Sequence, residues 1–312
     1  MVRSPSHATL LRPPLRSAAR GVAPIRNVLS VDVEEFYHAT IFQEATATQS
    51  VPRQSRVESA VERILQLFAD HDTRATFFVL GSVAAMHAGM VRQIAALGHE
   101  IACHGYAHDL VSSQTAGTFR QDVQAAKRVL EDVVGRPVLG YRAPSFSIGP
   151  EQSWAYSILI DEGFAYDSSS YPILHDRYGQ RTAPRFPHVV ARQRGRRLIE
   201  FPIGTARCCG VNLPIGGGGW FRLLPISWVR GGIRRVNRVD SRPSMFFFHP
   251  WELDPDLPQP AMAWHQRFRL TVGLTRSESK LRALLGALRF TTAQEALVSL
   301  GLLIEQASSK AA

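Results

Sequence analysis

Short apolar runs alternate with amphipathic segments along most of the chain, and this alternation predicts repeated strand–helix units. Residues 28–33 form a short apolar run that ends in acidic residues, which is typical of a buried strand. Residues 56–69 carry apolar side chains at helical spacing, and a β-rich run follows at 75–80. Further strands are expected at 99–103, 138–141, 164–166, 198–203 and 244–248, with helices at 82–97 (N-cap Ser82), 118–134 and 151–162.

Repeated strand–helix units with short links favour parallel pairing, in an open doubly wound sheet or in a barrel. Polar residues at the ends of the expected strands discriminate between the two. Five chemically capable side chains lie at, or just past, the carboxyl end of a strand: Asp32, His104, Arg142, Asp167 and His249. Since that face carries the active site of parallel barrels, their convergence favours a barrel.

Two stretches break the alternation. Residues 171–197 are rich in Pro and Arg and are expected to form a loop. Residues 211–228 contain the run Gly216–Gly219, which lacks the following Lys-Ser/Thr of a phosphate-binding loop. We therefore expect a flexible loop near the rim of the cleft rather than a nucleotide site.

Composition and charge narrow the class of protein. The chain has 312 residues, 45% of them hydrophobic, which suffices for one large α/β domain, and no apolar run approaches the roughly 18 residues of a membrane span. Residues 1–27 are Arg-, Pro- and Ser-rich without a signal-peptide apolar core, which predicts a basic, disordered arm and a cytoplasmic chain. Three cysteines give no disulfide framework.

The net charge of +10 comes almost entirely from arginine, concentrated in the arm and in residues 185–242. Such a surface could attract anionic lipid headgroups, an acidic polysaccharide or a lipid-linked sugar phosphate, or it could only reflect solvation. No zinc finger or aromatic RNA-binding signature accompanies the charge, so no specific nucleic acid is expected. Peripheral contact of the arm with the inner membrane face is an alternative to a freely soluble chain.

His104 and His108 place two imidazoles four residues apart, so that both can face one divalent ion. Asp32 and Glu34 add two carboxylates at the end of the first strand, and alternation points both the same way. Two histidines and one carboxylate complete a three-ligand site with an open position for water.

Five motifs in order resemble those of the NodB-like polysaccharide deacetylases, carbohydrate esterase family 4. They are Val31–Glu34, Gly98–Ile101 with His104 and His108, Tyr141–Pro144, Tyr166–Ser169 and Phe247–Trp251. Asp-Val-Glu, Tyr-Asp-Ser-Ser, Asn212-Leu213-Pro214 with the glycine run, and His-Pro-Trp-Glu further resemble the deacetylases found with exosortase-linked exopolysaccharide loci.

The resemblance implies an α/β fold, namely a distorted parallel (β/α) barrel of about seven strands in one domain with a C-terminal extension. It covers residues 28–297, with a subfamily-specific portion at about 205–297, and leaves a tail at 298–312. It implies Asp32 as general base, Arg142 as the residue that holds it, His249 as general acid, Asp167 as the orienting partner of His249, and Glu34, His104 and His108 as metal ligands. The family more commonly has two adjacent aspartates in the first motif, so Glu34 and Glu35 both remain candidates for the acidic ligand.

These residue types also suit amide hydrolysis on chemical grounds. A metal lowers the pKa of bound water, a carboxylate takes its remaining proton, and an acid protonates the departing nitrogen. Ser145 is a candidate backbone donor to the oxyanion, and Trp220 and Trp251 belong either to the core or to sugar-stacking platforms.

The sequence therefore predicts a metal-dependent hydrolase, with zinc, cobalt or nickel as cofactor, that removes acetyl groups from N-acetylhexosamine units of a polysaccharide or a lipid-linked precursor. Two alternatives are hydrolysis of a non-sugar cyclic amide at the same site, and a non-catalytic barrel that binds carbohydrate or nucleic acid.

Overall fold

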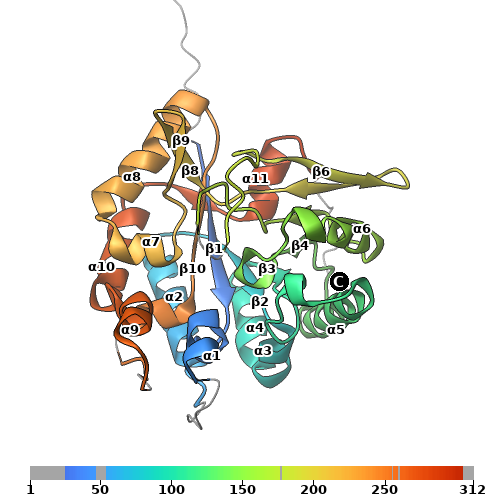
Figure 1. Cartoon of the computed structure of the whole chain (residues 1–312), viewed down its shortest axis with the longest axis horizontal. Helices are drawn as coiled ribbons and strands as arrows, with labels where there is room; N and C mark the ends of the chain where they lie inside the picture. The colour runs from blue at the N-terminus through green and yellow to red at the C-terminus, as the bar shows by residue number, and fades with distance from the viewer. Residues whose placement is uncertain (1–24, 47–53, 176–177, 255, 259–260, 305–312) are drawn as a thin grey trace, which may run out of the picture.

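The computed structural model describes residues 25–46, 54–175, 178–254, 256–258 and 261–304. Its centre is a mostly parallel sheet with helices packed around it (Figure 1). The strands of this sheet, in their order across it, are β10 (Met245–Phe248), β1 (Asn27–Val33), β2 (Thr76–Val79), β3 (Glu100–Cys103), β4 (Gly140–Tyr141), β5 (Tyr166–Asp167), β7 (Arg196–Glu200) and β6 (His188–Gln193), with β11 (Phe290–Thr291) also pairing with β1. A separate hairpin joins β8 (Thr205–Cys208) and β9 (Val211–Pro214).

Helices separate these strands in chain order except from β5 to β9, which follow one another without a helix between them. The α-helices are α1 (Thr40–Thr46), α2 (Val57–Asp70), α3 (Gly81–Met86), α4 (Ala88–Ala96), α5 (Ala116–Val134), α6 (Trp154–Asp161), α7 (Gly218–Leu223), α8 (Ile226–Arg235), α9 (Trp264–Thr271), α10 (Leu274–Leu285) and α11 (Ala293–Ser299). Short 3-10 or π turns lie at η1 (Phe36–His38), η2 (Val111–Ser113), η3 (Pro144–Phe146), η4 (Pro150–Gln152), η5 (Val236–Asp240) and η6 (Pro250–Leu253). None of the helices in the described part of the chain is long and apolar enough to span a membrane.

The strands β10 through β7 pair in parallel, and only the edge strand β6 is antiparallel. Beyond β7, Ile203 forms a single parallel bridge with Met245 of β10, and the amide of Gly204 donates to the carbonyl of Met245 at 2.9 Å. The sheet therefore curves until its two sides approach each other at this bridge. No continuous ladder closes the ring among the described residues, but the expected α/β fold of mostly parallel strands is confirmed.

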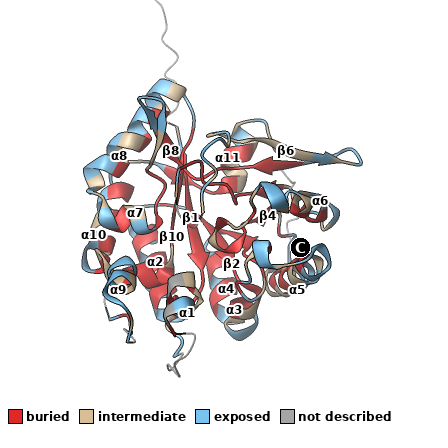
Figure 2. Ribbon diagram, viewed as in Figure 1, coloured by how far each residue is buried: buried red, intermediate tan, exposed pale blue. Residues whose placement is uncertain are grey.

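The sheet is buried on both faces. All seven residues of β1 are buried, as expected of a parallel strand with side chains packed above and below it. Figure 2 shows this buried centre in red, with exposed residues on the outer faces of the helices, in the loops and on the hairpins. The periodic apolar positions of the predicted helices face this core, as Val61, Ile64 and Phe68 of α2 illustrate.

The four predicted helices correspond to α2, to α3 with α4, to α5 and to α6, although some of their ends differ, whereas α1 and α7 to α11 were not predicted. The segment expected as one helix from Ser82 is two, because His87 leaves the helical region at φ −123° and ψ 43°. The expected N-cap Ser82 is also wrong, since α3 begins at Gly81 with Leu80 as its N-cap. By contrast, α5 has the start and stop that its sequence favours: a capping box between Thr115 and Thr118, and Gly135 in the left-handed region at its end.

Both stretches that were expected to be loops contain regular secondary structure. Within 171–197, β6 pairs with β7 around a turn at Arg194 and Gly195, both at positive φ, so the expectation of an unbroken loop is wrong there. The glycine run is not a free loop either. Gly217 forms a parallel bridge with Phe247 of β10, and α7 begins at Gly218. Glycines are needed there because a Cβ on Gly217 would lie 1.8 Å from the carbonyl oxygen of Phe247.

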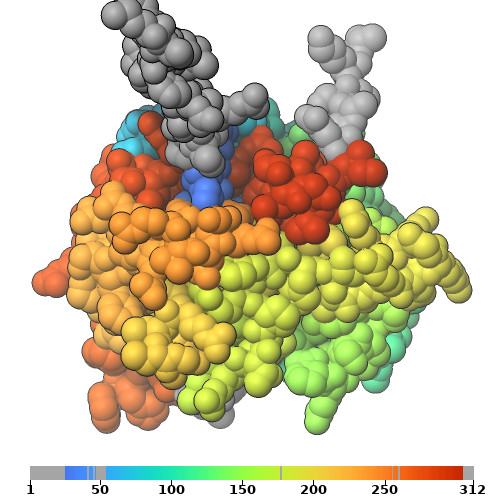
Figure 3. Space-filling model, turned by 90° about the horizontal axis from the view of Figure 1, so that it is seen from above, coloured from blue at the N-terminus to red at the C-terminus, as the bar shows by residue number. Residues whose placement is uncertain are grey.

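Segments far apart in the sequence meet at the amino end of β1. The amide of Asn27 donates to the carbonyl of Arg289, just before β11, and the amide of Val28 donates to Ser244, just before β10. In Figure 3 the blue start of β1 lies between orange and red segments from the C-terminal third. Residues 1–24 of the predicted arm at 1–27, and residues 305–312 of the predicted tail at 298–312, lie outside the described residues.

Substitution of Gly217 by alanine should destabilise the fold by at least about 2 kcal/mol, because the new methyl group meets the backbone of β10 and φ is +114°. Gly210 is the matched control: it also has positive φ (80°), but a Cβ there meets nothing within 4 Å, so alanine should cost only about 1 kcal/mol. Urea unfolding followed by circular dichroism measures both. Equal losses would contradict the close approach of Gly217 to β10.

Candidate active site

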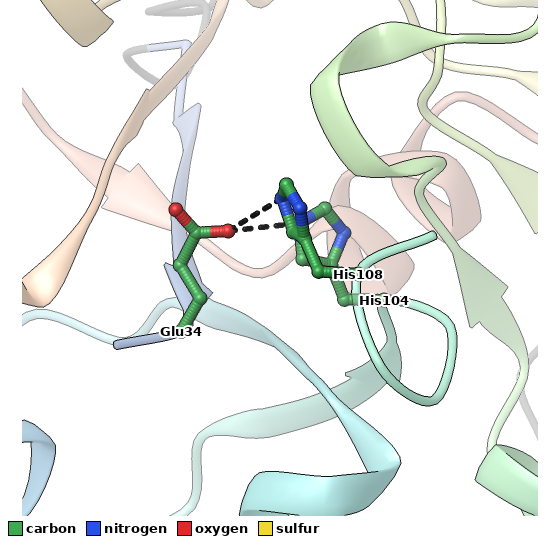
Figure 4. A group of neighbouring side chains, drawn as sticks. All are labelled: Glu34, His104 and His108. Carbon is green, nitrogen blue, oxygen red and sulfur yellow. Dashed lines mark ion pairs between the residues drawn. The ribbon is translucent and has the colours of Figure 1, made fainter. Parts of the chain in front are cut away.

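Three predicted metal ligands converge at the carboxyl ends of β1 and β3. Glu34 follows β1, while His104 and His108 lie in the loop after β3, and their ligand atoms all lie within 4.8 Å of one another (Figure 4). Glu34 Oε2 is 2.7 Å from His108 Nε2 and 3.8 Å from His104 Nε2. All three side chains are buried. The loop can turn this tightly because Gly105 and His108 both have positive φ.

The contacts of this cluster fit a metal ion. His104 Nδ1 lies 2.9 Å from the carbonyl oxygen of Arg142, which selects the Nδ1–H tautomer and leaves the Nε2 lone pair facing Glu34. Glu34 Oε2 is buried and has no hydrogen-bond partner among the described residues. A buried carboxylate oxygen without a donor, facing two imidazole nitrogens, is the arrangement that a divalent cation satisfies.

Glu34, not Glu35, is the carboxylate in this cluster. The Glu35 side chain turns the other way and accepts hydrogen bonds from the backbone amides of Arg56 (3.1 Å) and Val57 (3.4 Å), and from the hydroxyl of Ser55. These amides are free donors at the start of α2, so Glu35 caps that helix. The two adjacent acids therefore have separate tasks.

Asp32 is held by Arg142, as the sequence predicted. Arg142 Nη1 is 2.5 Å from Asp32 Oδ1, and both side chains are buried. The same guanidinium donates to Ser30 and to the carbonyl and hydroxyl of Ser168, and it stacks over the Phe78 ring at 4.0 Å. With all its nitrogens engaged, Arg142 cannot turn away from Asp32, which fixes the orientation of this carboxylate.

His249 follows β10 and faces the same cluster from the opposite side. Its Nε2 is 4.0 Å from Asp32 Oδ2 and 3.8 Å from Glu34 Oε1. Its Nδ1 is 2.6 Å from Glu252 Oε1, and its ring stacks on Trp251 with centroids 5.1 Å apart. The acid, the base and the metal ligands predicted from sequence are thus brought together.

Burial and neighbouring charges shift the pKa values of these groups in opposite directions. Burial raises the pKa of Glu34, but the imidazoles of His108 and His249 outweigh it and hold that pKa well below its usual range. Burial lowers the pKa of His104 to about 4, which favours the neutral, ligating form. For His249 burial favours the neutral ring, yet the carboxylates of Glu34 and Glu252 outweigh burial and raise its pKa to about 9.

Among the described residues, the carboxylate next to His249 Nδ1 is that of Glu252 and not that of Asp167. The Asp167 carboxyl accepts from the Ser169 hydroxyl at 2.6 Å and shares a hydrogen bond with the buried Glu200. Burial raises the pKa of Asp167 to about 6, and burial next to Asp167 raises that of Glu200 well above its usual value. Burial raises both pKa values, while the hydrogen bond between the two groups favours the charged form of Asp167 and the protonated form of Glu200, as expected for one proton held between them.

The expected substrate-binding residues line a cavity of about 1140 Å³ that also contains the cluster. Ser145 lies on its wall with φ 50°, its hydroxyl 2.9 Å from that of Thr40. Trp220 lines the cavity near His175. Trp251 is only 8% exposed, with its ring covered by His249 and by Arg222, whose guanidinium is 5.2 Å from the ring centroid. A stacking platform at Trp251 is therefore wrong: its indole supports His249.

Sequence reasoning missed four residues around this cavity. Glu252 and Arg222 lie behind His249, and Trp264 and Phe268 of α9 lie on the rim, 81% and 52% exposed. The His249-Pro-Trp-Glu252 spacing could have revealed Glu252, because side chains three apart eclipse in a 3-10 turn. The others depend on tertiary packing.

Comparison with known proteins agrees with this geometry. Residues 50–156 match the polysaccharide deacetylase family. This part of the chain is therefore similar to polysaccharide deacetylase domains. Residues 168–298 match a domain of unknown function, DUF3473, which fits the narrower subfamily. Within the site, the deacetylase match contains His104, His108 and Arg142, whereas His249 and Glu252 belong to the DUF3473 segment.

Curated relatives of the deacetylase domain cover only part of the chain. A peptidoglycan deacetylase of Helicobacter pylori is 28% identical over 39% of this chain and 39% of its own length. A peptidoglycan-N-acetylglucosamine deacetylase of Bacillus cereus is 30% identical over 30% of this chain and 34% of its own length. The chain thus matches well under half of the length of each.

Solved structures share the fold at low identity. A Mycobacterium smegmatis protein assigned to the polysaccharide deacetylases superposes with a TM-score of 0.56 at 17% identity, covering 93% of this chain and 99% of that one. The Puue allantoinase gives a TM-score of 0.58 at 17% identity, covering 90% and 91%. At this identity the likeness concerns the fold alone.

The Asp167–Glu200 pair predicts a pH-dependent stability. A carboxyl whose folded pKa is raised contributes stability that is complete below the unfolded pKa, about 4, and is lost as pH rises through the folded pKa, which is about 6 for Asp167 and is raised well above its usual value for Glu200. Glu200→Gln keeps a donor to Asp167 without the second charge. The variant should match wild type near pH 5 and exceed it at pH 8 by on the order of 1–2 kcal/mol in urea unfolding. A constant difference across this range would contradict the shared proton.

Proposed function

We propose that this chain is a metal-dependent deacetylase that hydrolyses the N-acetyl amide of an N-acetylhexosamine unit in a polysaccharide or its lipid-linked precursor. One observation carries the proposal. A carboxylate held by an arginine, an imidazole held by a second carboxylate, and a Glu-His-His cluster all face one cavity. A binding protein needs no base, acid and ligand set together, so this convergence supports hydrolysis over the binding alternative.

Glu34, His104 and His108 would hold the metal ion. Zinc suits two imidazoles and a carboxylate best, and cobalt and nickel accept the same donors. A bound ion would lower the pKa of a water molecule to about 7 and polarise the acetyl carbonyl.

The remaining steps rest on side chains of this chain. Asp32, kept in place by Arg142, takes the proton from the attacking water. His249 gives a proton to the nitrogen as the C–N bond breaks, so that acetate and a free amine leave. The backbone N–H of Ser145, on the cavity wall, is the proposed donor to the oxyanion. Asp167, which is paired with Ser169 and Glu200, takes no part in these steps.

A sugar polymer suits the rim of the cavity. Trp220, Trp264 and Phe268 present aromatic surface at its mouth, while Trp251 is engaged inside. Aromatic faces stack on the apolar faces of sugar rings, and exposed Trp and Phe side chains are seldom placed at a cleft without a ligand. We therefore replace Trp251 by Trp264 and Phe268 in the proposed substrate-binding set.

A cytoplasmic location, contact of the basic arm with the inner membrane face, and a single catalytic domain over 28–297 remain predictions from the sequence. A role in exopolysaccharide synthesis is proposed on the resemblance alone.

Metal content and turnover should separate the ligands from the acid. His104→Ala/His108→Ala should abolish metal binding, whereas His249→Ala, which removes no ligand, should keep near one ion per chain and lose 100-fold or more of the acetate release. Elemental analysis and an acetate assay on N-acetylated oligosaccharides measure the two properties. Equal metal loss in both variants would overturn the division of roles.

The same assay tests the substrate class. Acetate release from N-acetylhexosamine oligomers, without hydrolysis of a cyclic ureide such as allantoin, supports the proposal. Hydrolysis of the ureide alone would move the function to the cyclic amides, and no hydrolysis of either by the metal-loaded protein would favour the binding alternative.

The position of Trp264 on the rim predicts that its contribution to KM depends on the length of the oligomer. Trp264→Ala should raise KM for long oligomers at least fivefold but change KM for a monosaccharide or disaccharide less than twofold, because only a longer chain reaches α9. Trp228, 43% exposed and away from the cavity lining, is the matched control, and Trp228→Ala should change neither. A uniform rise in KM for all lengths would exclude the platform.

A further inference from the structure

The imidazole ring of His249 is contacted on one face by an indole ring and at one edge by a carboxylate. Trp251 stacks on the ring with an interplanar angle of 17°, and Glu252 Oε1 meets Nδ1 at 2.6 Å. Both neighbours come from the turn η6, of which His249 is the N-cap. Since residues three apart eclipse in a 3-10 helix, this turn places the Glu252 carboxylate against the ring that precedes it.

The carboxylate of Glu252 also faces a buried arginine, Arg222. Glu252 is 1% exposed, and its second oxygen, Oε2, lies 3.5 Å from Nε of the buried Arg222. Within the described residues neither of these two atoms has a hydrogen-bond partner, so the opposite charges of Arg222 and Glu252 stabilise each other directly.

Arg222 cannot move away from Glu252. Its terminal nitrogens donate to the carbonyl oxygens of Leu270 (2.7 Å), Arg269 (3.0 Å) and Val272 (3.2 Å) at the end of α9. These carbonyls have no partner inside a helix that ends there, and a guanidinium satisfies several of them at once. The contacts run from the backbone of the rim helix through Arg222 and Glu252 to His249.

We propose that Glu252, anchored by Arg222, is the positioning residue of His249: it accepts the Nδ1 proton and leaves Nε2 as the atom that faces Asp32 and Glu34 in the cavity. The proposal rests on the proposed function, in which His249 donates to the departing amine. It assigns to the DUF3473 segment both the acid and the residues that orient it.

The tautomer determines whether His249 can act. With Nδ1–H donated to Glu252, Nε2 is the nitrogen that gives up a proton and takes one back. As the C–N bond breaks, its electron pair goes to the leaving nitrogen, which receives the Nε2 proton. The imidazole is then neutral and still bonded to Glu252 through Nδ1. A ring with the opposite tautomer, or turned about its Cβ–Cγ bond, would present no proton donor to the amine.

Glu252→Ala should therefore change the tautomer of His249. In long-range proton–nitrogen NMR spectra of the full chain with labelled histidine, wild type should show Nδ1–H at the alkaline end of a pH titration, and the variant mainly Nε2–H. In acetate release kcat should fall 10–100-fold, with KM and metal content changed less than threefold.

Asp254→Asn is the matched control. Asp254 lies two residues beyond Glu252 and pairs with Arg56 at 2.5 Å, so its loss weakens the same turn without contact to His249. This variant should keep the tautomer and keep kcat within twofold. An unchanged tautomer in Glu252→Ala, or an equal fall of kcat in Asp254→Asn, would overturn the proposal.

Glu252→Gln covers the case in which Glu252→Ala fails to fold, because it keeps the volume and the acceptor oxygen but removes the charge. It should retain Nδ1–H and move the alkaline limb of the kcat profile to lower pH, since a neutral partner stabilises the imidazolium less. An unmoved limb would contradict the contact. The NMR result requires no substrate, so a chain that releases no acetate but shows the expected tautomers would refute the proposed function and leave the role of Glu252 standing.

Discussion

The buried ion pair between Arg142 and Asp32 is the contact on which the site depends. A buried guanidinium is tolerated only when nearly all its donors are satisfied, and here the partners come from different strands: Ser30 and Asp32 of β1, Ser168 just past β5, and Met245 of β10. Such a set of contacts exists only if the sheet curves enough to bring these strands around one side chain. The Arg142 guanidinium that holds Asp32 in place therefore also requires the strands to curve around it.

The second constraint is the pairing of β1 with β10, residues from opposite ends of the described chain. Parallel register across this pair sets Val31 beside Phe248, so Asp32 and His249 follow at the same edge of the sheet. The base comes from β1, which precedes the deacetylase match, and the acid comes from the DUF3473 segment. Gly217 and Ile203 buttress β10 by isolated bridges. The C-terminal segment is therefore part of the active-site wall as well as a supporting layer of the fold.

Charge balance links the site to its surroundings. Three carboxylates, Asp32, Glu34 and Glu252, lie buried within reach of His249, and each has its own cationic or metal-ligating neighbour. Nearby, Asp167 and Glu200 avoid two adjacent charges by sharing a proton. A cluster so rich in acids is stable only because every negative charge is paired, protonated or available to a cation.

Apolar periodicity and strand-end chemistry predicted the alternation of strands and helices in the first half of the chain, the parallel sheet, and the residues Asp32, His104, His108, Arg142 and His249. Those signals are local, because burial on both faces requires an apolar strand and catalysis requires reactive groups at its end. The choice between Glu34 and Glu35 was not local, since the direction of each carboxylate depends on where α2 begins. The partner of His249 was equally undetermined: Asp167 and Glu252 are both acids near the right motifs, and only packing put Glu200 beside one and Arg222 beside the other. The hairpin of β6 and β7 and the bridge at Gly217 were not predictable from the sequence either. The polar composition of β6 gives no strand pattern, and the partner of Gly217, Phe247, lies far away in the sequence.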